Sequence, residues 1–482
     1  MKKNIYFLVS FFLYFSCTLE REEFSKLEES NFFKNESDCK AALASLYEIM
    51  QGPHGGWING NQLGAFLISD MAADILGGNN GWDWFMEHRY NPDNFSRPEM
   101  DLLDKFSKVK EVTTCRSFIL RMEALDNISE DIKNLYIAEA RAIRAYLLHH
   151  FYIYFGTVPI VPDHLILNPN VVEYTPRPSR EEYIKIIQDE IDLALPFLKH
   201  PKDQLLEEEY GRMNKGIAYM ILMQLYMIEK DWEKVMTYGQ AIMDLNYYEL
   251  QPDYLSIFSI NNQRNKEVIY GIPRKQSIPN NGNTWHAISL PSSYPWKGTK
   301  WGVYYVRWSF IDTFKPADKR LLGLPQSYTG IDGKSYNRSN MIGAIAMKYD
   351  EDPAMVGHNS NHIIVRQRYA DVWLSMAEAD NELNGPTNRA VAYFNKIRLR
   401  TGLPNLPKNL TKEQFRDSVL LERAHEFYLE GHRYQDLVRH GKFYEVASKM
   451  PNSVLKPDQI LFPIPTKYII EYKGILTQNP GY

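Results

Sequence analysis

Residues 368–384 read RYADVWLSMAEADNELN, and residues 422–442 read ERAHEFYLEGHRYQDLVRHGK. Around the first stretch, apolar residues recur in alternating steps of four and three, at Val365, Tyr369, Val372, Met376, Ala379 and Leu383. The second stretch repeats the pattern at Leu420, Ala424, Phe427, Gly431, Tyr434 and Val438. This spacing places apolar side chains in one stripe along a helix, so both stretches predict helices packed on helices. Gly431, inside a buried stripe, predicts close approach of a neighbouring backbone.

Helix pairs are expected in two further places. Residues 214–246 predict two helices with a turn at Lys230–Asp231, and residues 366–400 predict two helices with a turn at Gly385–Pro386. Each pair is about as long as a tetratricopeptide unit of ~34 residues. The sequence therefore predicts a mainly α protein built as a tetratricopeptide-like superhelix of helix pairs.

Helix starts are also readable along the chain. Ser179 with Glu182, and Thr411 with Gln414, have the spacing of capping boxes. The scaffold is expected over about 37–50, 107–250 and 363–445. An irregular, loop-rich lobe is expected over about 51–106 and 250–362, where glycine, proline and tryptophan concentrate. Together they would form one unit spanning residues 37–482.

The N-terminus predicts export and lipid attachment. Lys2 and Lys3 precede an apolar run from Ile5 to Phe15, which suits a secretory signal and is too short to span a bilayer. Ser16 and Cys17 follow at once, so residues 1–16 are expected to be a lipoprotein signal peptide and Cys17 the lipidated residue. Residues 17–36 would then be a polar tether. The alternative is an ordinary signal peptide with a bystander cysteine.

Composition excludes several classes of protein. The chain has 482 residues, 44% of them apolar, and a net charge of −4, which gives nucleic-acid binding little support. Beyond Cys17 the only cysteines are Cys39 and Cys115, which cannot form a disulfide framework or a zinc motif. We therefore expect no metal and no cofactor.

No stretch of the sequence carries a catalytic motif. There is no Gly-x-Ser-x-Gly elbow and no Walker loop, and Leu429 stands where a zinc-protease motif begun by His425–Glu426 needs its second histidine. Glu422, Glu426 and Glu430 share one helix face. We interpret this row as a structural ion network, relieved by Arg423 and Arg433, in preference to an acid–base site.

The aromatic residues of the irregular regions point to ligand binding. An indole offers a flat apolar face to the C–H face of a sugar, while nearby amides meet the hydroxyl groups. Loops on a rigid helical scaffold commonly carry such residues. The expected ligand-binding residues are Trp82, Trp84, Trp285, Trp296, Trp301 and Tyr304. The alternative for each ring is that it fixes a loop to the helical scaffold.

Five segments resemble the SusD/RagB family, in the family's order. They are ESNFFKNESDCKAALASLYEIM (29–50), ARAIRAYLLHHFYIYFGTVPIV (140–161), the helices at 368–400 and 422–442, and LTQNPGY (476–482). Members of this family are nutrient-binding lipoproteins on the surface of Bacteroidetes cells. The resemblance covers nearly the whole chain and implies a scaffold of about four tetratricopeptide-like pairs with an irregular lobe packed on it.

The resemblance also implies a function. A member of this family would capture oligosaccharide or polysaccharide at the outer membrane and deliver it to a SusC-like TonB-dependent transporter, without catalysis. Ligand residues have no fixed motif in the family, so the aromatic residues above rest on their own argument. Peptide binding of the RagB kind, a tetratricopeptide protein–protein adaptor and, least expected, a surface glycosidase remain alternatives.

Overall fold

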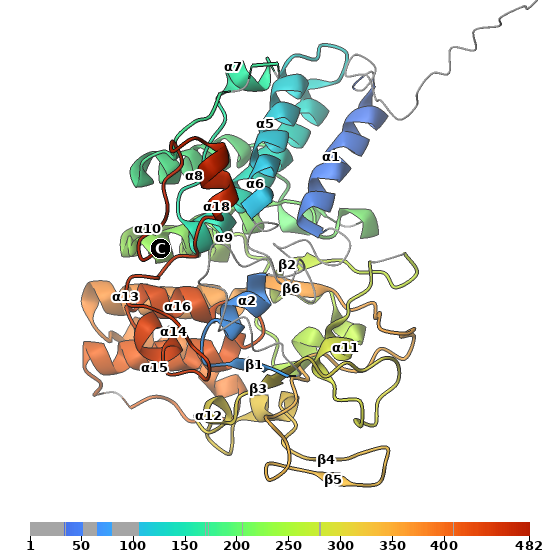
Figure 1. The fold of residues 1–482 in the computed structure, drawn as a ribbon, viewed down its shortest axis with the longest axis vertical. Helices are drawn as coiled ribbons and strands as arrows, with labels where there is room; N and C mark the ends of the chain where they lie inside the picture. Colours follow the sequence, from blue (N-terminus) through green and yellow to red (C-terminus); the bar gives the residue numbers. More distant parts are fainter. Residues whose placement is uncertain are drawn as a thin grey trace, which may run out of the picture.

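The structure is a computed structural model that describes residues 33, 35–51, 65–79, 106–168, 170, 171, 173–204, 206–278, 281–407 and 409–482. Helices dominate it; in Figure 1 they fill the top and the lower left of the molecule, while short strands and long loops lie at the lower right. Of the helices found in the described residues, none is long and apolar enough to cross a membrane. The mainly α, helix-pair fold class is confirmed.

Most of the scaffold helices pack against the next scaffold helix along the chain. They are α1 (Glu36–Gln51), α5 (Lys110–Glu123), α6 (Glu130–Phe155), α8 (Arg180–Ala194), α9 (Lys215–Glu229), α10 (Trp232–Asp244), α13 (Tyr369–Asn384), α14 (Asn388–Arg400), α15 (Lys412–Phe427) and α16 (Arg433–Arg439). Both predicted pairs are present, since α9 pairs with α10 and α13 with α14. Lys230, with φ 57°, ends α9 in the left-handed conformation and lets the chain reverse.

Shorter helices lie between and after the scaffold helices. They are α2 (Ala65–Met71), α7 (Asp163–Ile166), α11 (Trp285–Ser289), α12 (Trp308–Ile311), α17 (Phe443–Ala447) and α18 (Thr466–Glu471). Both predicted capping boxes form. The Ser179 hydroxyl accepts from Glu182 N–H, and the Glu182 carboxylate accepts from Ser179 N–H at the start of α8. Thr411 and Gln414 do the same for α15.

Three antiparallel two-stranded ladders occur in the described residues. Strand β1 (Leu76–Gly78) pairs with β3 (Tyr304–Val306), β2 (Val268–Ile272) with β6 (Ile364–Arg368), and β4 (Tyr328–Thr329) with β5 (Ser335–Tyr336). Every residue of β2 and β6 is buried. This ladder therefore lies inside the molecule, between the helical scaffold and the irregular region (Figure 1).

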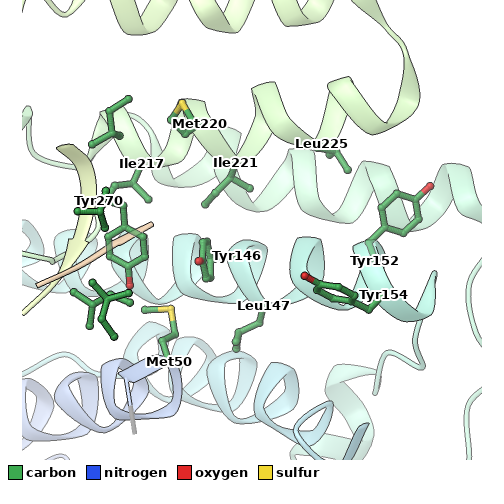
Figure 2. Packing of buried hydrophobic residues seen from close by; sticks show 14 of the residues in the cluster. Met50, Tyr146, Leu147, Tyr152, Tyr154, Ile217, Met220, Ile221, Leu225 and Tyr270 are labelled. Carbon is green, nitrogen blue, oxygen red and sulfur yellow. The ribbon is translucent and has the colours of Figure 1, made fainter. Parts of the chain in front are cut away.

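One large apolar core joins the scaffold helices. Figure 2 shows Tyr146 and Leu147 of α6 between Ile217 and Ile221 of α9 on one side and Met50 of α1 on the other. Small residues on α6 let the helices approach closely; Ala138, Ala142 and Ala145 are each at most 1% exposed. Cys39 and Cys115 are buried, free thiols in this core.

Two local predictions are wrong. Val365 lies in strand β6, because residues 364–368 pair with β2, and helix α13 begins only at Tyr369. The second stripe is not one helix either. Helix α15 ends at Phe427, and Leu429 (φ 63°) and Gly431 (φ 85°) form a turn before α16. Gly431 thus serves a backbone conformation that favours glycine, not a helix–helix contact.

Candidate functional site

Four aromatic rings follow one another across the irregular region. Tyr328 and Tyr336 stack with their ring centroids 4.7 Å apart and an interplanar angle of 5°, and Tyr294 lies 4.9 Å from Tyr328. Trp296 lies 6.3 Å beyond Tyr294. All four side chains are half-buried, so each keeps some surface open to solvent. We call Tyr336, Tyr328, Tyr294 and Trp296 the aromatic row.

A hairpin supplies one end of the row. Tyr328 and Tyr336 are register partners across β4 and β5, which places their rings side by side on one face of the ladder. Gly333, with φ 74°, makes the turn between the strands. The hairpin contacts the loop that carries Tyr294, because Ile331 N–H donates to the Ser293 carbonyl over 2.9 Å. The Ser293 and Tyr328 hydroxyls lie 2.8 Å apart.

Buried groups support the other end of the row. The Trp296 ring lies over the His286 ring at 5.0 Å. Burial, and then the nearby His362, lower the pKa of His286 to about 4, so this imidazole is neutral at pH 7. Its Nε2 lies 3.1 Å from the Tyr349 carbonyl, which can only accept, so Nε2 carries the proton. Trp296 therefore rests on a fixed, uncharged base.

Trp301 is the most exposed of the predicted residues that the structure describes. Its side chain is 39% exposed, and its ring lies 5.4 Å from that of His358. The backbone N–H of Trp301 donates to the Ala287 carbonyl over 2.6 Å, and this hydrogen bond connects the segment to α11. Trp296 and Trp301 thus both present ring surface on the segment that follows α11, and they remain candidates for ligand contact.

Two predicted ligand residues are placed in the core instead. Trp285 and Tyr304 are each 3% exposed. The Trp285 indole donates to the Ala346 carbonyl over 3.2 Å, and Tyr304 is the register partner of Gly78 in the β1–β3 ladder. These long-range contacts turn both rings away from solvent, so their assignment as ligand contacts is corrected. Trp82 and Trp84 lie outside the described residues.

Sequence reasoning missed the three tyrosines of the row. It gave weight to tryptophan, whereas Tyr294, Tyr328 and Tyr336 are three among 32 tyrosines. One signal was available: Tyr328 and Tyr336 stand on either side of the Asp332–Gly333 turn. A hairpin closed there pairs the two residues.

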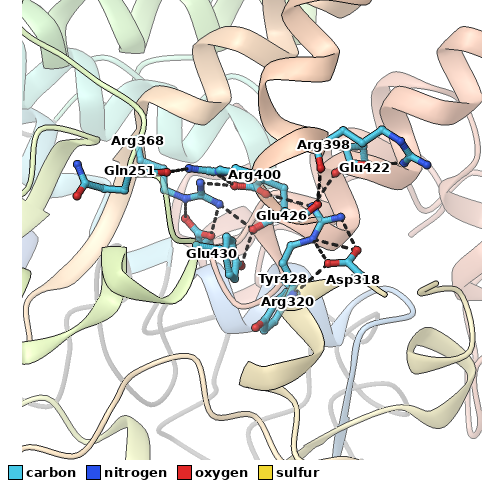
Figure 3. Close-up of polar contacts among 12 residues, drawn as sticks. Gln251, Asp318, Arg320, Arg368, Arg398, Arg400, Glu422, Glu426, Tyr428 and Glu430 are labelled. Atoms are coloured by element: carbon cyan, nitrogen blue, oxygen red, sulfur yellow. Dashed lines mark hydrogen bonds and ion pairs between the residues drawn. The ribbon is translucent and has the colours of Figure 1, made fainter. Parts of the chain in front are cut away.

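The three glutamates form the predicted ion network, but with other partners and not on one helix face, because Glu430 lies in the turn after α15. Figure 3 shows Glu422, Glu426 and Glu430 bonded to arginines from several elements. The full ion network, as we use the term, comprises Glu267, Asp318, Arg320, Lys348, Arg368, Arg398, Arg400, Glu422, Glu426 and Glu430. Arg423 and Arg433, the predicted partners, instead bind Asp371, Asp436 and Asp74.

The network is buried and electrically balanced, with five cations and five carboxylates. Burial alone would raise the pKa of Glu426, but Arg400, Arg368 and Arg320 outweigh burial and hold it well below its usual range. A permanently ionised, fully paired carboxylate cannot serve as a general acid. This supports a structural role for the row of glutamates.

One Ser–His–Asp arrangement occurs in the irregular region. His362 Nδ1 lies 3.1 Å from Ser360 Oγ, and Nε2 lies 2.8 Å from Asp350 Oδ1. However, Ser360 is fully buried and its hydroxyl donates to the Asn283 carbonyl over 3.2 Å. A nucleophile needs access to its substrate, so this arrangement fixes the loop to the neighbouring Asn283 segment instead of attacking a substrate.

A large hollow lies elsewhere in the molecule. It has a volume of about 890 Å³ and lies between α1, α5 and the segment around α7, at the end opposite to the β4–β5 hairpin (Figure 1). Its lining includes Phe33, Phe118 and Leu165 but no tryptophan or tyrosine. The aromatic row is therefore the better match to a ligand with flat C–H faces.

Known proteins resemble the chain over its whole length. Residues 327–482 match the family model described as the SusD family. SusD-like protein P25 of Formosa agariphila is 26% identical, with 95% of each chain aligned. A SusD homolog from Bacteroides thetaiotaomicron superposes with a TM-score of 0.78 at 20% identity, covering 95% of this chain and 99% of that one.

A third relative was solved with a sugar. Surface glycan-binding protein A from Bacteroides thetaiotaomicron, in complex with laminarihexaose, has a TM-score of 0.74 at 20% identity and covers 92% of this chain and 99% of that one. At this identity the likeness shows a shared fold. The family match in the C-terminal third and the full-length alignment agree with the resemblance of the sequence to the SusD family.

Proposed function

We propose that the protein is a non-catalytic glycan-binding lipoprotein of the cell surface. It would capture oligosaccharides on the aromatic row and deliver them to a SusC-like TonB-dependent transporter of the outer membrane. The observation that carries the proposal is the row itself: four half-buried rings in succession, with neighbouring centroids 4.7, 4.9 and 6.3 Å apart. Such a surface matches the flat faces of a sugar chain.

The expected affinity is modest. If each ring contributes about 1 kcal/mol and binding entropy opposes association, a single site would bind with a Kd between tens of micromolar and millimolar. Many anchored copies on one polymer would hold it far more tightly through multivalency. Weak single sites also release their ligand quickly, which suits transfer to a transporter.

Replacing Trp296 by alanine tests the site. Trp296→Ala removes the ring that lies against His286, and we expect glycan affinity to fall about fivefold, because one platform worth about 1 kcal/mol is lost. Isothermal calorimetry of residues 18–482 against neutral polysaccharides, acidic polysaccharides and peptides measures the loss. Trp232→Ala, a half-buried tryptophan at the start of α10, is the matched control and should bind like the wild type.

The calorimetry also separates the alternatives. Binding of peptides, with no glycan bound at millimolar concentration, would replace the proposal by a peptide-uptake role. Glycan binding that is unchanged in Trp296→Ala would move the site away from the aromatic row. Hydrolysis of a bound glycan would contradict a non-catalytic role.

The membrane part of the proposal depends on Cys17. Cys17 follows the apolar run of the leader after one residue, Ser16, at a position that suits the acylated cysteine of a lipoprotein. Cys17→Ala should abolish incorporation of labelled palmitate and release the protein from the membrane fraction, because two or more acyl chains are needed for stable anchoring. Cys115→Ala, a change to a buried thiol, is the control and should remain membrane-bound. Membrane attachment that survives Cys17→Ala would overturn the anchor.

A further inference from the structure

The segment that carries half of the aromatic row contains no acidic residue. From Val268 to Ile311 the chain has 44 residues, five of them Lys or Arg, and no Asp or Glu. At the chain's average acidic content, 59 of 482 residues, a stretch of this length would carry about five carboxylates. The deficit is therefore a marked local excess of positive charge.

Three of these five cations are buried or paired with other groups of the protein. Arg274 and Arg307 are buried, and Arg307 Nε donates to the Leu76 carbonyl over 2.9 Å. Lys275 Nζ lies 3.2 Å from the Glu207 carboxylate. Lys297 and Lys300 remain, and within the described part of the chain no carboxylate lies within ion-pair distance of either one. Both lie between Trp296 and Trp301 in sequence.

Lys300 is held in place by the row itself. Its ammonium donates to the Tyr294 carbonyl over 2.8 Å and to the Trp296 carbonyl over 3.0 Å. An ammonium has three N–H donors, so one remains for a further acceptor. Because both acceptors are backbone groups of row residues, the charge is fixed at the rim of the row. Lys297 is exposed and adds a second positive charge.

The nearest acidic residue of the hairpin does not cancel this charge. Asp332 belongs to the turn between β4 and β5, at the Tyr336 end of the row. Its carboxylate accepts from the Tyr336 hydroxyl over 3.0 Å and lies 3.7 Å from Lys334 Nζ. Asp332 is thus occupied within the hairpin. At the Trp296 end, Asp350 and Asp352 lie near His286, but Asp350 is bound to Ser259 and His362, and Asp352 accepts from the Ala354 and Asn361 N–H groups. Neither carboxylate pairs with Lys297 or Lys300.

We propose that the aromatic row takes acidic glycans, whose carboxylate or sulfate groups bind Lys300 and Lys297 while the sugar rings stack on the row. This inference rests on the proposed function and names its ligand class. A fixed ammonium with a free donor and no protein carboxylate is complementary to an anion, and charge-assisted hydrogen bonds of this kind are stronger than neutral ones. The same charge would attract a polyanion from solution.

The test compares polymers that differ only in charge. Affinities of residues 18–482 are measured by calorimetry for polygalacturonate and its methyl ester, for carrageenan and its desulfated form, and for laminarin as a neutral polymer. The ester pair reports on carboxylates and the carrageenan pair on sulfates. We expect at least one acidic polymer to bind about tenfold more tightly than its neutral partner, and the advantage to shrink as salt is raised.

Substitutions of the two lysines test whether the preference for acidic polymers arises at the aromatic row. Lys300→Met and the exposed change Lys297→Glu should each weaken the acidic polymer about fivefold or more and change a neutral polymer less than twofold. Lys300→Arg should keep most of the affinity. Lys275→Met, a lysine of the same segment that is paired with Glu207, should leave the affinity unchanged. Thermal melts check that each variant is folded, and Lys297→Glu removes no hydrogen bond from the loop.

The outcomes separate the two proposals. Equal affinity for charged and uncharged polymers, lost in Trp296→Ala but kept in Lys300→Met and Lys297→Glu, would overturn the acidic ligand and leave glycan binding intact. Acidic polymers that bind Trp296→Ala as well as the wild type would show nonspecific attraction and overturn the inference. No binding of any polymer would overturn glycan binding itself.

Discussion

Arg368→Met should lower the free energy of unfolding by about 3–5 kcal/mol, the largest effect we expect from a single substitution in this protein. Arg368 is 1% exposed and donates to the Glu267, Glu426 and Glu430 carboxylates at 2.9, 2.5 and 2.7 Å. Methionine fills much of the space but supplies no charge. Three buried carboxylates would lose a partner, and the balanced network would carry one excess negative charge.

Urea unfolding followed by circular dichroism measures the loss. The matched control is Lys185→Met on α8, which removes an ion pair with Asp189 whose side chains are both exposed. Such a pair contributes at most about 0.5 kcal/mol. Arg368→Lys keeps the charge but lacks the planar guanidinium fork whose separated nitrogens reach the three carboxylates, so it should fall between the two. A loss in Arg368→Met no greater than in the control would show that the network adds little to stability.

Asp70→Asn should stabilise the protein at pH 8 and not at pH 5. Burial raises the pKa of Asp70 to about 8, against a usual value of 3.8. Its Oδ2 accepts from Leu429 N–H over 2.5 Å, and Oδ1 has no hydrogen-bond partner. Asparagine keeps an acceptor for Leu429 and never ionises.

The sign follows from proton linkage. Well below pH 4 the Asp70 carboxyl is protonated in both the folded and the unfolded chain, so its ionisation does not lower the free energy of unfolding. As pH rises towards 8 only the unfolded chain loses its proton, and the wild type is progressively destabilised. The stability of Asp70→Asn relative to wild type should therefore increase by on the order of 3 kcal/mol between pH 5 and pH 8.

Unfolding free energies at the two pH values test this expectation. The control is Asp189→Asn, since Asp189 is exposed on α8 and its substitution should have nearly the same effect at both pH values. An advantage of Asp70→Asn that is constant from pH 5 to pH 8 would mean that Asp70 ionises normally in the folded protein.

Periodicity was sufficient where neighbouring residues decide the structure. The stripes of α9, α10, α13 and α14 and the capping box at Ser179 depend on residues within one or two helical turns, and the structure contains them. The break after Phe427 depends on a distant residue, since Asp70 accepts the Leu429 N–H. Gly431 is a local signal for this turn, but the apolar stripe that runs through it masked that signal.

The candidate site also combines features that neighbouring residues decide with features that distant residues decide. Composition located the aromatic segments, and Trp296 and Trp301 do present ring surface. It could not tell that the Trp285 indole would reach the Ala346 carbonyl, because that hydrogen bond spans 61 positions. The Tyr328–Tyr336 stack required the register of a hairpin, which sequence spacing leaves open until the turn is fixed.

The hairpin that carries Tyr328 and Tyr336 takes no part in the buried ion network. Its connection to the neighbouring loop includes the Ile331–Ser293 backbone bond and the hydroxyl contact of Ser293 with Tyr328. Residues 327–337 could therefore diverge or be exchanged between related proteins at little thermodynamic cost. A protein built this way can change the surface that contacts its ligand by altering one peripheral loop, while the buried network that stabilises the fold stays the same.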